Sequence, residues 1–398
     1  MNSPWQRTAH GANLLGPDGA LGVTIFEEIT ALANRHGAIN LGQGFPDQDG
    51  PAVLSRLAQE AIAAGHNQYA PGKGILDLRQ AVAEHQLRFY GITVDPESEV
   101  IVSTGATEAI AAAVLALAGP GDEVLTFEPF YDSYGAMIAL SGARHTTAAL
   151  LAPDFLPDIA ALEDSFSERT CMVLLNNPHN PTGAMFPEAV LAEIVRLAIK
   201  YDAVIVSDEV YEHLTFGPRH IPVATVPGAA ERTLTISSAG KTFSFTGWKI
   251  GWMSGPAELV AAARTVKQFL SYSSGTPFQG AIAAGLRLER DFFTTTAATL
   301  AHKRDILAQG LRAAGLEVHL PQGTYFINAD TQKLGITDAT ALARRLPELI
   351  GVAAIPVPMF CHPEGAKRNR SLLRFAFCKQ TQVLEEAAER LATLGGRL

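Results

Sequence analysis

Cysteine is scarce in this sequence. Its 398 residues contain three cysteines, Cys171, Cys361 and Cys378, and none of them forms the CxxC spacing of zinc or redox sites. This usage is typical of a reduced compartment, so we expect a cytoplasmic protein. Cys361 and His362 are two potential metal ligands in sequence, but no second pair accompanies them, and we expect no metal.

An excess of positive charge is also missing. The chain has 31 lysines and arginines against 40 acidic residues, which gives a net charge of −9 and argues against nucleic acid as a main partner. The longest apolar run, Ala109–Ala118, is too short to cross a bilayer. The N-terminus is polar and lacks the apolar centre of a secretory signal. We therefore expect neither a nucleic-acid partner nor a membrane partner.

Several catalytic motifs are absent as well. The sequence contains no HExxH, no GxSxG and no internal repeat. Gly240-Lys241-Thr242 looks like the end of a phosphate-binding P-loop, but that motif needs a glycine where Thr235 stands. Two interpretations of Lys241 remain at this point. It is either a solvated turn residue or a Schiff-base lysine that holds the aldehyde of pyridoxal phosphate.

The stretch 233-TLTISSAGKTFSFTGWKIGWMSG-255 surrounds this lysine. Its first four residues, Thr233–Ile236, alternate as a strand does, and Lys241 follows where that strand ends. Residues Ile250–Ser254 predict another short strand. Open α/β sheets bind ligands beyond the carboxyl ends of their strands, so a reactive amine is well placed here. Ser238 and Lys249 would hold a phosphate beside it.

From Val100 onward, short β-branched runs alternate with amphipathic helical runs. We predict strands at Val100–Ser103, Glu123–Phe127, Cys171–Leu175 and Ala203–Ser207, with helices at Glu108–Ala118, Tyr134–Ser141 and Glu188–Tyr201 between them. This alternation indicates an α/β fold, with a mostly parallel central sheet in a large α/β/α domain. Most of the polar residues of interest follow the end of a predicted strand.

The remainder of the chain predicts a smaller α+β domain. We expect an N-terminal arm over 1–50, with one short helix around Ile25–Asn34 and part of the smaller domain, a large domain over 51–291, and the smaller domain over 292–398. Further predicted helices are Pro51–Ala64, Leu76–Tyr90, Val260–Phe269, Phe278–Asp291, Ala297–Ala314, Ala339–Leu346 and Gln382–Leu394. The predicted strands of the smaller domain are Glu317–Leu320, Tyr325–Ala329 and 371–379.

Each part of a pyridoxal-phosphate site has a candidate in the sequence. Gly105, Ala106 and Thr107 begin a helix and offer N–H groups to a phosphate. Asp208, at a strand end, suits the pyridine nitrogen, which needs a buried carboxylate. Each candidate also has a simpler explanation when it is taken alone. The first three residues could be a plain helix cap, and Asp208 could be a surface acid.

Three further parts complete the set. Tyr211 and Asn180 suit the phenolic oxygen of the cofactor, and Tyr131 could stack on its ring or pack in the core. Arg374 is the sole charge in the apolar run 372-LLRFAF-377. It suits a substrate α-carboxylate, unless it forms an internal ion pair.

These motifs, in this order, resemble the class I aminotransferases among the fold-type-I pyridoxal-phosphate enzymes, from about Gly37 to the C-terminus. The resemblance rests on 41-LGQGFPD-47, 67-NQYAPGKG-74, 104-TGATEAI-110, 128-EPFYDSY-134, 176-NNPHNPTG-183, 207-SDEVYEHL-214, 237-SSAGKTFSFTGWKIGW-252 and 373-LRFAFCK-379. Within the family the chain is most similar to the branch with kynurenine, methionine and N-succinyldiaminopimelate aminotransferases. The resemblance implies a ping-pong transfer of an amino group between an L-amino acid and a 2-oxo acid.

The resemblance also implies roles for individual residues. Lys241 is expected to be the catalytic Schiff-base lysine and proton carrier. The expected cofactor-binding residues are Asp208 on the pyridine nitrogen, Tyr131 on the ring face, Asn180 and Tyr211 on the phenolic oxygen, and Gly105, Ala106, Thr107, Ser238 and Lys249 on the phosphate. Arg374, Gly44 and Asn180 are expected to bind the substrate carboxylate. Tyr69 is expected to reach the phosphate of a neighbouring subunit, which implies a homodimer with shared active sites. The peptides Glu128–Pro129 and Asn180–Pro181 are expected to be cis.

The sequence departs from the aspartate-specific members of the family. Lys249 stands where those enzymes have an arginine, and 269-FLSYSSGTPF-278 offers no arginine for a distal carboxylate. Aspartate is therefore not expected to be the donor. An N-succinyldiaminopimelate substrate would need its charge to be met by Arg144, Lys73 or a neighbouring subunit. The motifs 351-GVAAIP-356 and 374-RFAFCK-379 nevertheless favour that branch.

Two alternatives remain open in the sequence. A carbon–sulfur β-lyase would use the same cofactor site on cysteine conjugates. A ligand-binding regulator would keep the fold without the reaction, although the arm before Gly37 has no room for a winged helix. Side-chain specificity is expected to depend on Ile25 and Phe26 of the arm, on the loop around Ser273, and on a neighbouring subunit.

Overall fold

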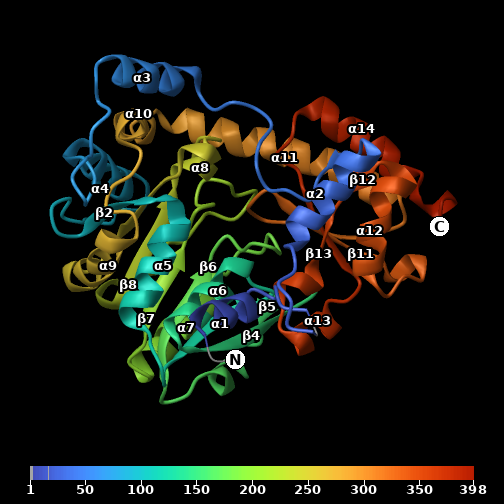
Figure 1. Ribbon diagram of the computed structural model, residues 1–398, viewed down its shortest axis with the longest axis horizontal. Helices are drawn as coiled ribbons and strands as arrows, with labels where there is room; N and C mark the ends of the chain where they lie inside the picture. Colours follow the sequence, from blue (N-terminus) through green and yellow to red (C-terminus); the bar gives the residue numbers. More distant parts are fainter. Residues whose placement is uncertain (1–2, 17) are drawn as a thin grey trace.

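The computed structural model describes residues 3–16 and 18–398. Its centre is an eight-stranded sheet in the order β2-β9-β8-β7-β6-β3-β4-β5 (Figure 1). The strands are β2 (Val100–Thr104), β3 (Glu123–Glu128), β4 (Arg144–Leu151), β5 (Leu156–Pro157), β6 (Thr170–Asn176), β7 (Val204–Asp208), β8 (Thr233–Ser238) and β9 (Ile250–Ser254).

Strand direction places many chain segments at one edge of this sheet. The pairs β3–β4, β3–β6, β6–β7 and β7–β8 are parallel, and β9 is antiparallel to both of its neighbours. Strand β5 is antiparallel to β4 at the other side of the sheet. The carboxyl ends of β2, β3, β6, β7 and β8 therefore share one edge, as the mostly parallel sheet predicted. Strands β4 and β5 were not predicted.

Helices cover both faces of the sheet. In β6, Met172 and Leu174 point to one face and Val173 and Leu175 to the other, because successive strand residues alternate. The first face packs against α5 (Gly105–Leu117), α6 (Asp132–Ser141) and α9 (Ala257–Leu270), and the second against α7 (Glu188–Lys200). Such burial on both sides explains why these strands are continuous apolar runs.

A further helical layer covers β2 and β9. It consists of α3 (Ala52–Ala63), α4 (Leu76–Tyr90) and α10 (Thr276–Leu286), whose apolar side chains pack on Val102, Ile250 and Trp252. The bounds of α4 and β9 are those predicted. The short helix α8 (Ala239–Thr242) directly follows β8.

The C-terminal part contains a second, smaller sheet. Its order is β10-β11-β14-β13, and its neighbouring strands are antiparallel. The elements are α11 (Arg290–Ala313), β10 (Glu317–His319), β11 (Phe326–Asp330), α12 (Ala339–Ile350), β12 (Val352–Ala353), β13 (Ile355–Pro356), α13 (Pro363–Arg368), β14 (Leu372–Ala376) and α14 (Thr381–Ala392). Figure 1 shows the long helix α11 running from the side of α10 toward α14.

The N-terminal segment contacts both parts. Helix α2 (Ile25–His36) packs against α12, and β1 (Ile39–Asn40) pairs in parallel with β12. Helix α1 (Pro4–Gly11) instead packs against α6, with Gly11 and Gly135 so close that a Cβ on either would lie 2.3–2.4 Å from the other's carbonyl oxygen. Only glycine fits such a contact. Helix α1 was not predicted, since the arm was expected to contain one helix.

The start of α11 also differs from the prediction. The chain was expected to stay helical from Phe278 to Asp291 and to begin a new helix at Ala297. Instead α10 ends at Leu286 and α11 begins at Arg290. Burial of Phe293 against α4 side chains outweighs the weak helix propensity of the threonines that follow it. The predicted boundary at 291/292 thus falls in the first turn of α11, and the domain division stays a prediction.

Short 3₁₀ turns complete the secondary structure. They are η1 (Leu162–Ser165), η2 (Val223–Thr225), η3 (Ala230–Arg232), η4 (Thr246–Trp248), η5 (Gln332–Leu334), η6 (Val357–Phe360) and η7 (Leu394–Gly396). The cis peptides Glu128–Pro129 and Asn180–Pro181 are confirmed, and Ala152–Pro153 and Asn177–Pro178 are cis as well. Among the described helices, none is both long enough and apolar enough to span a bilayer.

Candidate active site

Lys241 lies on α8, one turn beyond the carboxyl end of β8. Ser238 is the N-cap residue of this helix, and its hydroxyl accepts a hydrogen bond of 3.3 Å from the Gly240 N–H. The Lys241 Nζ donates a hydrogen bond of 2.8 Å to the hydroxyl oxygen of Tyr325. Burial disfavours the ammonium form and lowers the pKa of Lys241 to about 8. This lysine is therefore not a solvated turn residue, and a share of it is a free amine near neutral pH.

Asp208 ends β7 and is 4% exposed. The Tyr134 hydroxyl donates a hydrogen bond of 2.5 Å to its Oδ2, and the Asn176 side-chain amide donates one of 2.7 Å to its backbone carbonyl. Burial raises the pKa of Asp208 to about 6, and the Tyr134 hydrogen bond offsets part of that effect. The surface-acid explanation is thus wrong. Asp208 is a fixed carboxylate inside the protein.

Arg374 lies on β14 of the smaller sheet and is 2% exposed. Its guanidinium donates to Asn180 Oδ1 at 2.9 Å and to the Gly42 carbonyl at 3.1 Å. The rings of Phe326, Phe360 and Phe26 lie 4.0, 4.6 and 5.5 Å from the guanidinium carbon. Its hydrogen-bond partners are an amide and a carbonyl rather than a carboxylate, so an internal ion pair does not explain its position.

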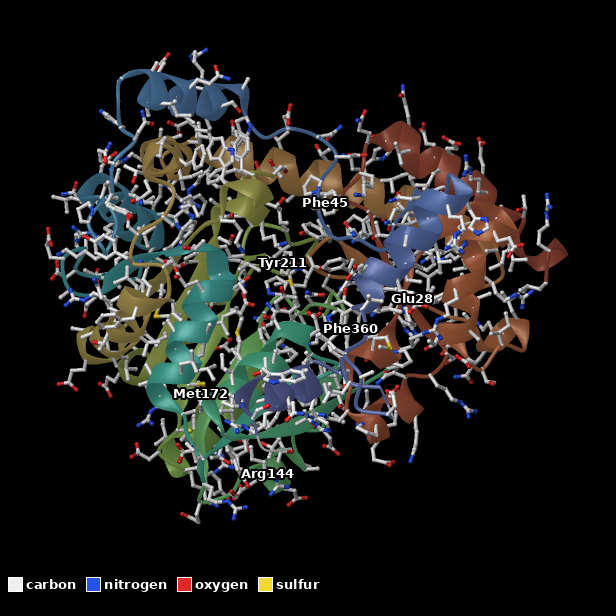
Figure 2. All side chains as sticks on the ribbon, in the orientation of Figure 1. Glu28, Phe45, Arg144, Met172, Tyr211 and Phe360 are labelled. Atoms are coloured by element: carbon white, nitrogen blue, oxygen red, sulfur yellow. The ribbon has the colours of Figure 1, made fainter. Side chains whose placement is uncertain are left out.

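These three side chains line one cavity of about 370 Å³. The other predicted residues that line it are Gly44, Gly105, Ala106, Thr107, Tyr131, Asn180, Tyr211, Ser238 and Lys249. Most of them lie at or just beyond the carboxyl ends of β2, β3, β6, β7 and β8, whereas Gly44 follows β1 and Lys249 directly precedes β9. Arg374 faces them from the smaller sheet. In Figure 2 the labelled Tyr211 lies near the middle of the molecule, where these two parts meet. The rule that ligands bind beyond the carboxyl ends of strands is obeyed.

One end of the cavity is built to receive an anion. Helix α5 begins at Gly105, whose φ of +71° is in the left-handed region that favours glycine. The N–H groups of its first turn have no partner inside the helix. A Cβ at Gly105 would lie 3.1 Å from the Lys249 Nζ, so this ammonium group lies beside the helix N-terminus. Free N–H groups, a helix dipole and an ammonium group together attract a phosphate-like ligand.

Comparison with known proteins agrees with this geometry. The family model described as aminotransferase class I and II matches residues 36–391, which is most of the chain. The chain belongs to this family. It is an aminotransferase.

Three relatives and one solved structure match nearly the whole chain. A Mycobacterium tuberculosis protein named probable N-succinyldiaminopimelate aminotransferase is 50% identical, covering 94% of this chain and 96% of that protein. The solved N-succinyldiaminopimelate aminotransferase structure from M. tuberculosis superposes with a TM-score of 0.91, covering 94% of this chain and 97% of that one. The methionine aminotransferase of Escherichia coli is 41% identical (94% and 96% covered). Rat kynurenine–oxoglutarate transaminase 3 is 36% identical (94% and 88% covered). The fold is therefore that of the fold-type-I aminotransferases, as the resemblance implied.

Tyr69 is the predicted site residue that the cavity of this aminotransferase does not include. Its side chain is 82% exposed, and its ring meets that of Tyr272 edge-on at 5.5 Å. An exposed tyrosine is what a residue reaching toward a neighbouring subunit requires. Its role there stays a prediction.

Arg144 and Lys73 do not serve the cavity. Arg144 begins β4, at the opposite edge of the sheet, and pairs with Glu123 at 3.2 Å. Figure 2 shows Arg144 at the periphery, well away from Tyr211. Lys73 pairs with Glu97 outside the cavity. Neither of them is available in this chain to meet a distal charge on a substrate.

The structure adds residues that the sequence interpretation missed. Tyr325 precedes β11, holds the Lys241 amine, and donates a hydrogen bond of 2.6 Å to the Gly44 carbonyl. Tyr134 holds Asp208, and its ring meets that of Tyr131 edge-on at 5.4 Å. Tyr134 stood in the motif 128-EPFYDSY-134, where Tyr131 alone was singled out. Tyr325 carried no local signal, because it lies 84 residues from the lysine that it contacts.

Proposed function

We propose that this aminotransferase uses pyridoxal 5′-phosphate to move an amino group from an L-amino acid with a long neutral side chain to a 2-oxo acid, by a ping-pong mechanism. The observation that carries the proposal is the meeting of Lys241, Asp208 and Arg374 in one buried cavity. When bound, the cofactor supplies an electron sink for the charge that develops at the substrate Cα.

The donors of the cavity fit this cofactor. A protonated pyridine nitrogen needs a buried carboxylate, and Asp208 is buried with a phenol and a backbone N–H as its side-chain partners. The phosphate needs N–H groups and a cation, which the first turn of α5 and Lys249 offer. We assign the phosphate to Gly105, Ala106, Thr107, Ser238 and Lys249. We assign the ring to Tyr131 on its face and to Asn180 and Tyr211 at its phenolic oxygen.

Lys241 is proposed to hold the cofactor and to move the substrate proton. A general base works best when its pKa lies near the working pH, and burial lowers the pKa of this amine to about 8. The hydrogen bond to Tyr325 fixes the position of the amine. Because Tyr325 also bonds to the Gly44 carbonyl, it ties the lysine to the loop that faces the substrate.

Arg374 is proposed to bind the substrate carboxylate together with Gly44 and Asn180. Its guanidinium has five N–H groups, and Asn180 and Gly42 account for two hydrogen bonds. Its Nε has no partner among the described residues, which leaves a donor free for a ligand. The phenylalanine rings around it exclude water and so strengthen a charge-assisted hydrogen bond.

A smaller cavity next to the first supports a preference for neutral side chains. It has a volume of about 240 Å³ and shares Phe26, Tyr131 and Asp132 with the main cavity. Its other lining residues are largely apolar, including Leu14, Val23, Ile25, Met359 and Phe360. Asp132 would repel a distal carboxylate. Methionine, kynurenine and glutamine are therefore the donors that this chain suits best.

N-succinyldiaminopimelate is the second candidate substrate. It is favoured by the 50% identity to the M. tuberculosis relative over 94% of the chain. Its distal carboxylates would need cations, and the described lining residues of both cavities include no lysine or arginine besides Lys241, Lys249 and Arg374. We infer that this substrate would require charge from the second subunit of a homodimer, to which Tyr69 would also contribute.

The test is a visible absorbance spectrum of the purified protein with pyridoxal phosphate, recorded before and after addition of single amino acids. We expect a yellow protein whose visible band bleaches with methionine, kynurenine or glutamine. If glutamate alone bleaches the band, glutamate is the amino donor, and a reaction of the N-succinyldiaminopimelate type is favoured. Pyruvate and ammonia from a cysteine conjugate, without an oxo acid, would indicate β-elimination at the same site.

Lys241→Ala provides the decisive variant. It should remove the yellow colour and all turnover, whereas Lys367→Ala, on an exposed helix, should behave as wild type. Arg374→Ala should keep the colour and mainly raise the KM for the amino acid. Turnover like that of the wild type in Lys241→Ala, or a protein that never takes up pyridoxal phosphate, would show that the site is wrongly assigned.

A further inference from the structure

A second group of chemically versatile side chains lies outside the active-site cavity, between α4 and the segment after β7. His85 belongs to α4, and Glu212 and His213 follow Asp208 in the chain. One donor atom from each of the three lies within 4.8 Å of the others. The two imidazoles meet through their Nε2 atoms at 2.7 Å.

Glu212 adds a carboxylate to this pair of histidines, whose rings meet edge-on. Its side chain is 4% exposed, and Oε1 accepts a hydrogen bond of 2.5 Å from the Ser237 hydroxyl. Its Oε2 makes no hydrogen bond of normal geometry with the described residues, and the neighbouring group that faces this carboxylate is the Tyr90 hydroxyl. A buried carboxylate oxygen without a well-formed hydrogen bond is costly, so this atom is a ready ligand for a cation.

We propose that His85 Nε2, His213 Nε2 and Glu212 Oε2 bind a zinc ion. Two imidazoles and one carboxylate are a donor set that Zn²⁺ takes, whereas Mg²⁺ and Ca²⁺ prefer oxygen ligands alone. To bind, the imidazole that donates its Nε2 proton moves this proton to its own Nδ1, so no proton leaves the protein from the pair. The two nitrogens then separate to about 3.3 Å, as tetrahedral geometry with Zn–N bonds of about 2.0 Å requires.

An adjoining cavity offers the ion a route and a fourth ligand. This cavity of about 590 Å³ is lined by Glu212 and His213, with Tyr90, His220 and Arg290 among its other residues. It has room for the water molecule that completes tetrahedral coordination. Arg290 repels cations, so binding must come from coordination bonds rather than from net charge. This again selects zinc over Mg²⁺ and Ca²⁺.

The site lies directly behind the catalytic residues. Glu212 follows Tyr211 in the chain, and Ser237, which donates a hydrogen bond to Glu212, precedes Ser238. A zinc ion here joins α4 to the segment that carries Asp208 and Tyr211. Its role is to hold that segment in place, separate from the amino-transfer chemistry.

The test is zinc binding by the full-length protein, loaded with pyridoxal phosphate and freed of metal by chelation. Equilibrium dialysis with metal analysis should give one Zn²⁺ per chain, and ZnCl₂ but not MgCl₂ should raise the unfolding temperature. X-ray absorption of the bound ion should show two imidazole nitrogens. The variants His85→Gln and His213→Asn each remove one ligand, and His66→Gln, an exposed histidine, is the matched control.

Each ligand variant should bind zinc at least tenfold more weakly. Mutation of residues that only hydrogen-bond to metal ligands already lowers metal affinity by roughly 10–100-fold. The His66→Gln variant should bind like the wild type. Glu212→Gln is less decisive, because it also changes the acceptor of the Ser237 hydrogen bond. Absence of stoichiometric zinc in the wild type would overturn the proposal. So would unchanged affinity in His85→Gln, with its fold verified by circular dichroism in metal-free buffer.

Discussion

Replacing Asp208 with asparagine should stabilise the protein when the cofactor has been removed. The carboxyl is buried, and burial raises its pKa from 3.8 to about 6. At pH 7 folding must therefore bury an ionised carboxylate, and the loss of its hydration costs free energy. A tenfold change in an equilibrium constant corresponds to about 1.4 kcal/mol, so this carboxylate costs up to about 3 kcal/mol. Asparagine keeps the shape and can still accept the Tyr134 hydrogen bond.

The pH dependence of this effect has a definite sign. Between about pH 4 and pH 6 the folded protein binds more protons at this position than the unfolded chain does. The contribution of Asp208 is therefore most favourable below pH 4 and is lost as the pH rises through 6. Asp208→Asn should match the wild type near pH 4 and exceed it by up to about 3 kcal/mol at pH 7.

The measurement is urea unfolding of cofactor-free wild type and Asp208→Asn at several pH values from 4 to 8. Asp154→Asn, which changes an exposed acid, is the control and should show no pH-dependent gain. With pyridoxal phosphate the order should invert, because the wild-type carboxylate then has a cationic partner. An Asp208→Asn variant no more stable than wild type at pH 7, or a gain independent of pH, would refute the reasoning.

Three further predictions concern the same cavity. Tyr325→Phe removes the acceptor for the Lys241 amine and the donor to the Gly44 carbonyl, so kcat/KM should fall by roughly tenfold or more while cofactor content stays normal. Gly105→Ala forces a side chain into a left-handed backbone beside Lys249, and fluorescence titration should show weaker binding of pyridoxal phosphate. The rate of cofactor uptake, measured by stopped-flow absorbance, should rise with pH through about 8 as the Lys241 amine loses its proton. A rate that does not change with pH would show that this amine is not the attacking group.

Local sequence patterns predicted the elements well where one face of each element meets the core. Helix Leu76–Tyr90 and strand Ile250–Ser254 have the predicted bounds, because apolar spacing decides burial within one element. The candidate residues predicted at strand ends line one cavity, since parallel strands bring their carboxyl ends to one edge. The errors lie where distant contacts outweigh local preference. Helix α1 forms because it packs against α6, and α11 begins early because Phe293 is buried.

The sequence by itself determined the family, the alternating architecture and most of the residues that line the cavity, because each of these depends on motifs that are short in sequence. Only the tertiary structure decided which side chains of the site contact and hydrogen-bond one another. Tyr325 reaches Lys241, and Tyr134 reaches Asp208, across 84 and 74 residues. His85 meets Glu212 and His213 only because α4 lies against the segment after β7. Contacts of this kind depend on strand order and helix packing, which no local spacing encodes.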